Sequence, residues 1–321
     1  MRRPLETPVK DPFPVLPFRT EVYGPDELFA GFSAADPRSY ASTLDFRAFR
    51  STVFPPTREV RMLRALHDQC ITDARDTLLL DRRVVAVMGG HELARGHAVY
   101  REVAGLARSL TERGVLVVSG GGPGAMEATH LGALLAGQPD VELTAAIEHL
   151  ASMAAFPEDA RSLVAMDGTV DLDVLERLHA WQVPAFDLVA GLDPASRGQS
   201  LAVPTWFYGQ EPPTPFASHV AKYFQNSVRE DGLLAIAADG VIYARGRAGT
   251  VQEVFQDAAQ NVYRPAGGRF SPMAFLDTDH CWSEELRVAP VLRHLFGDSD
   301  FGKYVRITPD PAEILAFLTS S

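Results

Sequence analysis

The sequence predicts an α/β protein with a Rossmann-like, doubly wound and mostly parallel sheet that carries helices on both faces. Two segments, 83–90 and 115–122, are almost continuously apolar and end in glycines, as "RVVAVMGG" and "VLVVSGGG". A stretch with helical periodicity follows each of them. Strands that are apolar on both sides and alternate with helices are typical of a parallel sheet covered on both faces.

The composition narrows the class of protein. The 321 residues are 46% hydrophobic, which suffices for a large core in one domain with extensions. The formal net charge of -11 argues against nonspecific binding of nucleic acid, because such proteins are usually basic. Two cysteines predict neither a disulfide framework nor a cysteine-based zinc site. The first residues lack an apolar signal core and no run approaches about 18 apolar residues, so we expect a cytoplasmic protein without membrane contact.

The chain is expected to consist of an arm and a domain. Residues 1–56 are rich in proline and form an N-terminal arm, either ordered on the body or partly disordered. Residues 57–321 form the Rossmann-like nucleotide-binding domain. Its first element is a helix at 57–80, which opens at Thr57 and has apolar residues at helical spacing.

Strands and helices alternate after this first helix. The strand at 83–90 leads to an amphipathic helix at 96–114, which ends at a glycine. The strand at 115–122 leads to a helix at 124–137. The run "VELTAAI" at 141–147 is expected to be a third strand.

The middle of the chain is less regular. The segment at about 148–199 is expected to be a lid-like insertion that contains a helix at 169–182. Strand character returns at 201–209, and one or two helices are expected at 218–240. The remaining elements are strands at 241–244, 272–277 and 304–307, and helices at 250–262, 284–296 and 310–319.

Three consecutive glycines, Pro123 and Gly124 occupy the junction between the strand at 115–122 and the next helix. Free N–H groups and the helix dipole at such a junction favour an anion. A tight turn that binds nothing is one alternative. A dinucleotide fingerprint is another, but Glu127 stands where its third glycine belongs, while Glu148 would imitate its ribose-binding acid.

A second glycine turn follows the strand at 241–244 and contains Gly246, Arg247 and Gly249. Two glycine turns at strand-to-helix junctions of one sheet predict a single ligand that is contacted from two sides. Thr250 and Glu253 have the spacing of a capping box, so a purely structural role at the helix start is the alternative. The polar face of the helix expected at 250–262 is as consistent with exposure to solvent as with contact to a ligand.

The segments "GGGPGAMEA" at 120–128 and "GRAGTVQE" at 246–253 resemble the signatures of the LONELY GUY-type phosphoribohydrolases, a family once mislabelled as lysine decarboxylases. The segment "MGGH" at 88–91 is more similar to the larger bacterial nucleotide 5′-monophosphate nucleosidases of the same superfamily. The resemblance covers roughly residues 80–140 and 201–320, and it leaves the arm and the insertion unexplained.

The resemblance implies a Rossmann-like fold that hydrolyses the N-glycosidic bond of a nucleoside 5′-monophosphate, without metal or organic cofactor, to free base and ribose 5-phosphate. It implies that Glu253 orients the ribose hydroxyls and stabilises the cationic transition state electrostatically. Arg229, by its placement in the preceding helix, would be the assisting arginine. The family also suggests a homodimer or higher homo-oligomer. The residues placed against the nucleotide are Gly89, Gly90, Gly121, Gly122, Gly124, Glu127, Asn226, Gly246, Arg247, Gly249 and Thr250.

The chain departs from the family pattern at three positions. Arg245 stands where the motif has proline, Arg247 where it has its second glycine, and Ala221 where a His-x-Arg-Lys run has arginine. The sequence therefore leaves two functions open: a nucleotide-monophosphate glycosidase, and a carrier or sensor that binds nucleotides without turnover. A Schiff-base decarboxylase has less support, since Lys222 is the one lysine near a motif.

Overall fold

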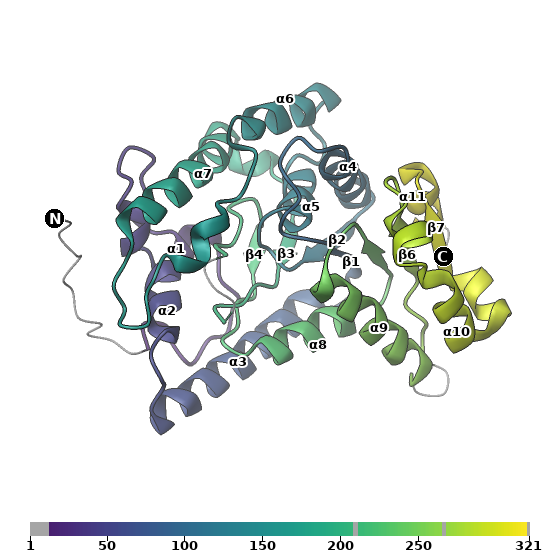
Figure 1. The fold of residues 1–321 in the computed structure, drawn as a ribbon, viewed down its shortest axis with the longest axis horizontal. Helices are drawn as coiled ribbons and strands as arrows, with labels where there is room; N and C mark the ends of the chain where they lie inside the picture. Colours follow the sequence, from purple (N-terminus) through teal and green to yellow (C-terminus); the bar gives the residue numbers. More distant parts are fainter. Residues whose placement is uncertain (1–12, 208–210, 265–267, 320–321) are drawn as a thin grey trace.

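The computed structural model describes residues 13–207, 211–264 and 268–319. Within these residues, seven strands form one sheet in the order β4-β3-β2-β1-β5-β6-β7, and every neighbouring pair is parallel. This is a Rossmann-like, doubly wound α/β fold, as the sequence predicts (Figure 1). The strands are β1 (Arg83–Met88), β2 (Val115–Ser119), β3 (Ser200–Ala202), β4 (His219–Val220), β5 (Val241–Tyr243), β6 (Met273–Leu276) and β7 (Val305–Thr308).

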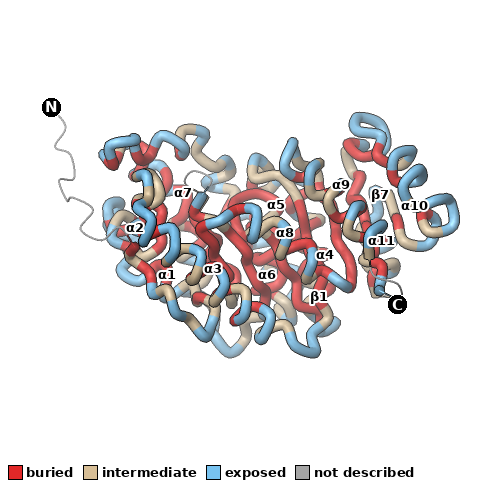
Figure 2. Tube along the Cα trace, turned by 90° about the horizontal axis from the view of Figure 1, so that it is seen from below, coloured by how far each residue is buried: buried red, intermediate tan, exposed pale blue. Residues whose placement is uncertain are grey.

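Helices cover both faces of the sheet, and alternate residues of the strands pack against opposite layers. In β1, Val84 and Ala86 belong to one hydrophobic cluster, whereas Val85 and Val87 belong to the other. Figure 2 shows the buried residues concentrated in the centre of the molecule and the exposed ones on the outer sides of the helices. One layer contains α4 (Ala98–Glu112), α5 (Ala125–Leu134), α6 (Asp140–Leu150) and α11 (Pro311–Thr319), and the other contains α3 (Arg58–Leu79), α8 (Asn226–Ile236), α9 (Ala248–Val262) and α10 (Val288–Tyr304).

The described part of the N-terminal arm is ordered and packs against the body. It contains α1 (Pro25–Leu28), a 3-10 turn and α2 (Leu44–Thr52). Tyr23 exchanges two backbone hydrogen bonds with Val220, at 2.9 and 2.8 Å. The arm therefore covers the outer edge of β4, which would otherwise present unpaired backbone groups. The first twelve residues of the arm lie outside the described residues.

Helix α3 begins where the sequence predicts. The hydroxyl of Thr57 accepts a hydrogen bond from the backbone N–H of Val60 at 3.3 Å, which satisfies one of the free amides at the helix start. Within the described part of the chain, neither α3 nor any other helix combines the length and the apolar composition that crossing a membrane requires.

The segment predicted as a third strand at 141–147 is helical, so this prediction is wrong. It forms α6, which starts after Pro139 and buries Ile147 and Leu150 on one side. A short apolar run does not by itself distinguish a strand from a buried helix segment, and here the helical spacing of the buried positions prevails. The chain then continues into α7 (Leu172–Gly191), which is longer than the predicted helix.

Further along the chain, three element boundaries differ from the prediction. The strand expected at 201–209 is the short β3, which stops ahead of Pro204. The segment expected to be helical at 218–240 first forms the two residues of β4 and becomes helical only at the start of α8. A π-helical turn at Cys281–Glu285 precedes α10, which starts and ends later than the helix predicted at 284–296.

Candidate functional site

The three glycine segments meet where the sheet reverses its strand order. From β1 the chain proceeds to β2, β3 and β4 on one side, whereas β5, β6 and β7 extend on the other. Gly89 and Gly90 follow β1, the segment 120–124 follows β2, and the segment 245–249 follows β5. The carboxyl ends of parallel strands at such a switch point form the usual ligand-binding crevice of doubly wound folds.

Backbone contacts hold these loops against one another. Gly90 N donates to the carbonyl of Arg245 at 2.9 Å, and Ala125 N donates to the carbonyl of Gly90 at 3.2 Å. A Cβ on Gly124 would stand 2.3 Å from the Gly90 carbonyl oxygen, and a Cβ on Gly90 would stand 3.2 Å from Gly246 Cα. Close backbone packing therefore requires glycine at Gly90 and Gly124, whether or not a ligand binds.

Four further glycines of the predicted site lie against side chains. Thr250 is among these neighbours and is buried, at 5% exposure, so its hydroxyl packs on the second glycine turn. A Cβ would stand 2.6 Å from Ala125 Cβ at Gly89, 2.6 Å from Ala202 Cβ at Gly121, 2.9 Å from Met126 Cε at Gly122 and 2.1 Å from Thr250 Oγ1 at Gly246.

Gly249 differs from these glycines, because a Cβ at this position would have no neighbour within 4 Å. It lies in the first turn of α9, whose N-cap residue Arg247 makes no side-chain cap. α5, which begins at Ala125, likewise has no side-chain cap at its N-cap residue Gly124, although its first amide donates to the Gly90 carbonyl. Both helices thus start beside the same loops with uncapped amides, and the positive ends of their dipoles favour an anion there.

Glu253 and Arg229 lie together beside these loops, on the helices α9 and α8. Arg229 Nη1 is 3.9 Å from Glu253 Oε1, and the two side chains are 13% and 15% exposed. Arg229 Nε donates to Asn226 Oδ1 at 3.2 Å. A Cβ on Gly120 would stand 3.8 Å from Arg229 Nη1, so the guanidinium reaches the first glycine loop. The fold thus brings Glu253, Arg229 and Asn226, three of the predicted polar residues of these helices, to one place.

Burial raises the pKa of Glu253 to about 7, although the Arg229 guanidinium opposes this shift and the Glu230 carboxylate adds to it. Glu230 Oε1 lies 3.8 Å from Arg229 Nη2. Burial also raises the pKa of Asp257, one turn further along α9, to about 7, while a 2.7 Å hydrogen bond from Tyr243 opposes the shift. A carboxyl group that titrates near neutrality in such a site is suited to proton transfer or to charge stabilisation.

The capping-box alternative for Glu253 is wrong. α9 begins at Ala248, so Thr250 is the third residue of the helix and Glu253 is the sixth. A capping box needs the hydroxyl at the N-cap and the acid at the third helical position. The polar side of α9 instead reaches α8, where Gln252 Nε2 donates to Glu230 Oε2 at 3.4 Å.

Glu127 faces the interior of the protein. Its carboxylate accepts two hydrogen bonds from the Arg95 guanidinium, at 2.7 and 2.6 Å, and one from Tyr100 Oη at 3.0 Å. The side chains of Glu127 and Arg95 are each 1% exposed. Arg95 also donates to the carbonyl of Trp181 at 2.8 Å. This buried pair ties α5 to the loop after β1 and to α7, a connection that no sequence motif indicated.

The two arginines that depart from the family pattern both contact carboxylates. Arg245 Nη1 donates to Asp279 Oδ2 at 2.9 Å, and its Nη2 donates to Glu285 Oε2 at 3.1 Å. Arg247 is 79% exposed, and its Nη2 lies 2.6 Å from Glu92 Oε2. Arg247 therefore reaches from the start of α9 to the loop after β1.

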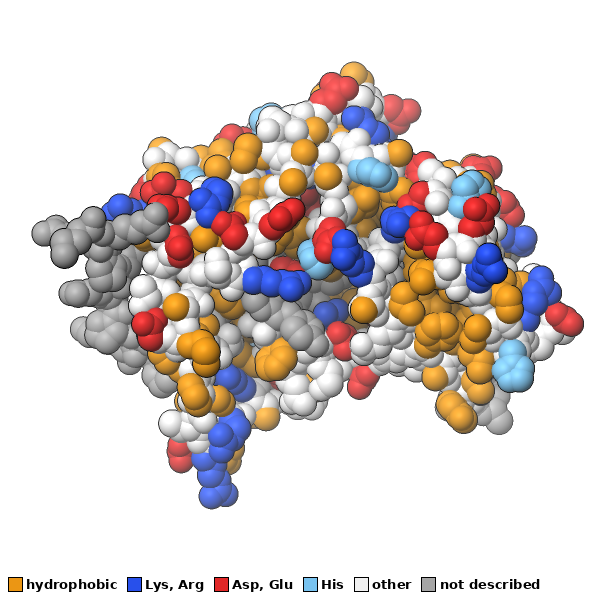
Figure 3. Space-filling model, in the orientation of Figure 1, with side chains coloured by type: hydrophobic (Ala, Val, Ile, Leu, Met, Phe, Trp, Pro, Cys, Tyr) orange, Lys and Arg blue, Asp and Glu red, His pale blue; other side chains and the backbone are white. Residues whose placement is uncertain are grey.

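The structure adds an acid and a histidine that the sequence analysis missed. A Cβ on Gly122 would stand 3.2 Å from Glu211 Oε2, and His91 Nδ1 lies 4.0 Å from Glu211 Oε1. Glu211 comes from the long connection between β3 and β4, where an unusual density of aromatic residues and prolines is the only signal. Figure 3 shows charged side chains of both signs and a histidine close together in the middle of the face that it draws.

Lys222 is held in a buried ion pair. Its Nζ lies 2.6 Å from Asp45 Oδ1, and the two side chains are 2% and 0% exposed. Asp45 also accepts hydrogen bonds from Tyr40 Oη and Trp206 Nε1, both at 2.9 Å. Burial lowers the pKa of Lys222, although Asp45 opposes this shift. The network ties the N-terminal arm to the segment after β4, and it leaves the amine without the access that a Schiff base requires.

The chain matches no protein-family model, and no curated protein sequence matches it. Within residues 13–207, 211–264 and 268–319, no group of three or more His, Cys, Asp or Glu side chains is arranged to hold a metal ion. The candidate site therefore rests on two features. One is the pair of uncapped helix starts that favour an anion, and the other is the buried carboxyl–guanidinium pair beside them.

Proposed function

We propose that the protein is a nucleotide phosphoribohydrolase, which hydrolyses the N-glycosidic bond of a nucleoside 5′-monophosphate to free base and ribose 5-phosphate. The observation that carries the proposal is the position of the Glu253–Arg229 pair beside the glycine loops, at the carboxyl ends of β1, β2 and β5. The motifs that resemble the LONELY GUY-type family contain the same loops and the same glutamate.

In the proposed mechanism, the amides at the starts of α5 and α9 bind the 5′-phosphate. Glu253 then accepts hydrogen bonds from the ribose hydroxyls, and the Arg229 guanidinium favours the ionised form of its carboxyl group. As the C1′–N bond breaks, its electron pair leaves with the base, and the carboxylate stabilises the positive charge that develops on the ribose. Water adds its hydroxyl to C1′, and its remaining proton ends on the base.

A carrier or sensor that binds the nucleotide without turnover is the second candidate. Two cationic side chains, Arg245 and Arg247, stand in the loop that would cradle the phosphate, and carboxylates engage both of them. A loop of this kind can hold a phosphate through charge while its bulk displaces the ribose from Glu253.

Incubation of the purified chain with a panel of nucleoside 5′-monophosphates, followed by chromatography of the free base, separates the two candidates. Base release that disappears in Glu253→Gln supports the hydrolase. Binding by calorimetry without base release supports the carrier. The matched nucleosides are the control, because charge-assisted bonds to the phosphate should make the nucleotide bind at least about tenfold more tightly. Equal affinity for both would contradict the phosphate site.

We also propose that the chain assembles into a homodimer or a higher homo-oligomer. Val262 and Tyr263 at the end of α9 are 40% and 85% exposed, and Val291 of α10 is 45% exposed. Figure 3 shows hydrophobic side chains gathered on the side of the molecule where these helices lie. Light scattering should give at least twice the chain mass of 35.0 kDa for the wild type, and a lower mass for Val262→Ser, Tyr263→Ser. A wild-type monomer would contradict this assembly.

A further inference from the structure

A cavity of about 750 Å³ lies at the opposite end of the sheet from the glycine loops. Its wall includes Pro272 directly ahead of β6, Tyr304 directly ahead of β7, and Phe317 of α11. It is thus built at the amino ends of β6 and β7, whereas the candidate functional site lies at the carboxyl ends of β1, β2 and β5. Its volume falls within the range of about 300–1,000 Å³ that small-molecule sites occupy.

Aromatic side chains form the apolar part of the wall of this cavity. The rings of Phe270 and Tyr304 stack with centroids 4.4 Å apart and planes inclined by 5°. Asn261 of α9 fixes the neighbouring backbone: its Oδ1 accepts from Ser271 N at 2.8 Å, and its Nδ2 donates to the Ser271 carbonyl at 3.1 Å. The wall is therefore preformed, which lowers the ordering cost of binding a ligand.

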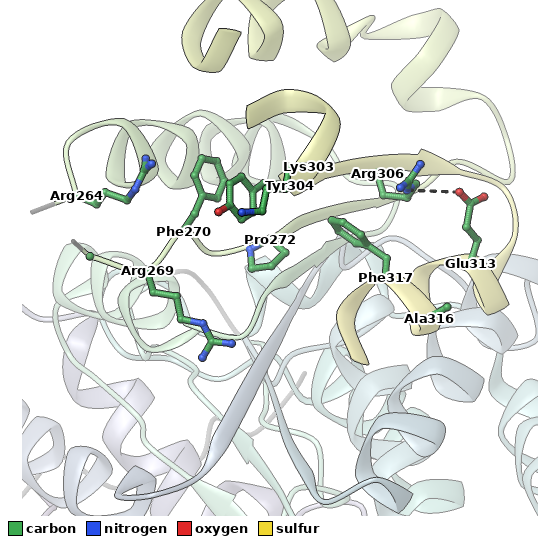
Figure 4. A pocket seen from close by; sticks show the side chains of 11 residues that line it. Arg264, Arg269, Phe270, Pro272, Lys303, Tyr304, Arg306, Glu313, Ala316 and Phe317 are labelled. Carbon is green, nitrogen blue, oxygen red and sulfur yellow. Dashed lines mark ion pairs between the residues drawn. The ribbon is translucent and has the colours of Figure 1, made fainter. Parts of the chain in front are cut away.

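Basic side chains surround these rings. The wall of the cavity contains four basic residues and one acidic residue, although the whole chain carries a net charge of -11. Figure 4 shows that the cations are spread around the rings, with Arg264 and Arg269 on one side and Arg306 on the other. The fourth, Lys303, has its Nζ 4.7 Å from the centroid of the Tyr304 ring.

The carboxylate partners of Arg264 and Arg306 are exposed. Exposed ion pairs add little stability, so a phosphate group can replace these two carboxylates at small cost. Arg269 pairs instead with the buried Asp239, which also accepts a hydrogen bond from Val84 N. Lys303 forms no ion pair within the described residues. The pairs are Arg264 with Asp300 at 3.6 Å, Arg269 with Asp239 at 2.9 Å, and Arg306 with Glu313 at 3.4 Å.

We propose that this cavity binds a small organic phosphate that carries a planar ring, the chemistry of a nucleoside diphosphate or triphosphate. The ring packs on the apolar wall formed by Phe270, Tyr304 and Phe317, and the phosphates contact the surrounding cations. A polyphosphate has the charge without the ring, and a nucleoside has the ring without the charge, so neither alone satisfies both parts of the cavity. The site is independent of the proposed hydrolase site and does not rest on that function.

Hydrogen exchange on the full-length chain, read by mass spectrometry, locates the binding. ATP, tripolyphosphate and adenosine are added separately at equal millimolar concentrations. We expect ATP to slow exchange at 268–273 and 300–306, and the other two compounds to need at least about tenfold higher concentration for the same effect. Slowed exchange confined to 88–91, 119–125 and 245–250 would report the candidate functional site alone and would overturn this proposal. Equal protection by tripolyphosphate would overturn the ring-binding part.

A double variant tests the cations directly. Arg269→Ser, Lys303→Ser changes two exposed positions, and an unchanged Tm verifies that the fold holds without the ion pair between Arg269 and the buried Asp239. Loss of two charge-assisted contacts should weaken ATP binding at this site by at least about tenfold. The matched control Arg58→Ser, Arg101→Ser removes the same charge from exposed positions on α3 and α4 and should bind ATP as the wild type does. Equal weakening in both double variants would show an effect of net charge alone and would overturn the site.

Discussion

Arg229 Nη1 lies 3.9 Å from Glu253 Oε1, and both side chains are largely buried between neighbouring helices. This separation exceeds the roughly 2.7–2.9 Å of a charge-assisted hydrogen bond, so the guanidinium attracts the carboxylate without saturating its oxygens. Desolvation outweighs that attraction, because the pKa of Glu253 is raised to about 7. The carboxylate is therefore held in place, charged in part at neutral pH, and still able to accept hydrogen bonds from a ligand.

Glu253→Gln should abolish base release and keep the fold and most of the nucleotide affinity. The change removes a charge at nearly constant shape, and loss of one well-placed electrostatic group lowers kcat by about 100-fold or more. Single-turnover base release and calorimetry with the same nucleoside monophosphate measure the two effects. Near wild-type turnover in this variant would remove Glu253 from the mechanism.

Glu230→Gln is the matched control for that variant. Glu230 also lies beside Arg229, and its carboxylate contributes to the raised pKa of Glu253. Removal of the neighbouring negative charge should lower the pKa of Glu253 and leave turnover at pH 8 within about threefold of the wild type, since the reacting carboxylate is retained. A loss as large as that of Glu253→Gln would indicate a general electrostatic effect.

The stability of the fold should depend on pH through Glu253. An ordinary glutamate in an unfolded chain has a pKa of about 4.3, whereas that of Glu253 in the fold is raised to about 7. The folded chain binds the proton more tightly, so this contribution to stability is fully present below about pH 4.3 and is lost as the pH rises through about 7.

The same comparison gives a measurement. In Glu253→Gln this pH dependence is absent. The Tm of the variant minus the Tm of the wild type should therefore increase as the pH is raised from about 5 to about 8. Asp257 shifts in the same direction but is present in both proteins, so its effect cancels. Thermal melts followed by circular dichroism provide the test, and a constant difference in Tm would show that the Glu253 carboxyl titrates as an exposed one does.

Two glycines should respond differently to alanine. Gly249→Ala adds a methyl group in open space within a helix, so Tm should be equal or higher. The free energy of unfolding should rise by up to about 1 kcal/mol. The same methyl stands beside the uncapped amides, so affinity for a nucleoside monophosphate should fall by about tenfold or more. Gly124→Ala should lower Tm, because its Cβ would stand 2.3 Å from a carbonyl oxygen at a φ of +71°. Unchanged affinity in Gly249→Ala, measured by calorimetry, would show that the phosphate does not contact the start of α9.

Arg247 and Glu92 should have opposite effects on the apparent affinity for substrate. Arg247→Gly removes a cation from the start of α9, so KM for the nucleoside monophosphate should rise by roughly tenfold while any turnover of the nucleoside stays unchanged. Glu92→Gln removes the carboxylate that lies 2.6 Å from Arg247, so the arginine becomes free for the phosphate and KM should fall. Steady-state kinetics of both variants test this, and a lower KM in Arg247→Gly would show that the arginine obstructs the site.

The fold could be predicted where residue type alone determines the backbone. The continuously apolar 83–88 and 115–119, each followed by glycines, are buried parallel strands because few other structures satisfy such a pattern. The prediction of a strand at 141–147 was wrong because its apolar positions fit both the strand period and the helix period. Packing against the neighbouring helices favours the helix α6. The two residues of β4 carry too little periodicity to be recognised, and they are a strand only because β3 and the arm lie beside them.

Part of the candidate site could likewise be predicted from the sequence, and part could not. The approach of the three glycine loops follows from strand order in a doubly wound sheet, so their meeting could be anticipated. Glu127 could not be placed, because its role depends on Arg95, a partner 32 residues away that no motif marks. Glu211 and His91 were missed for the same reason, since they meet only through the path of a long connection.

The strand order also dictates a sequence of events during synthesis. β1 lies between β2 and β5, so one of its edges has no partner until β5 has been made. Met88 and Val241 are about 150 residues apart, which at ribosomal speeds of roughly 5–20 residues per second leaves a valine-rich edge open for roughly 8–30 s. An open apolar edge is a template for pairing with other chains. The nascent protein therefore passes through an interval in which this edge is open to pairing with other chains, and the glycine loops after β1 and β5 come together only when that interval ends.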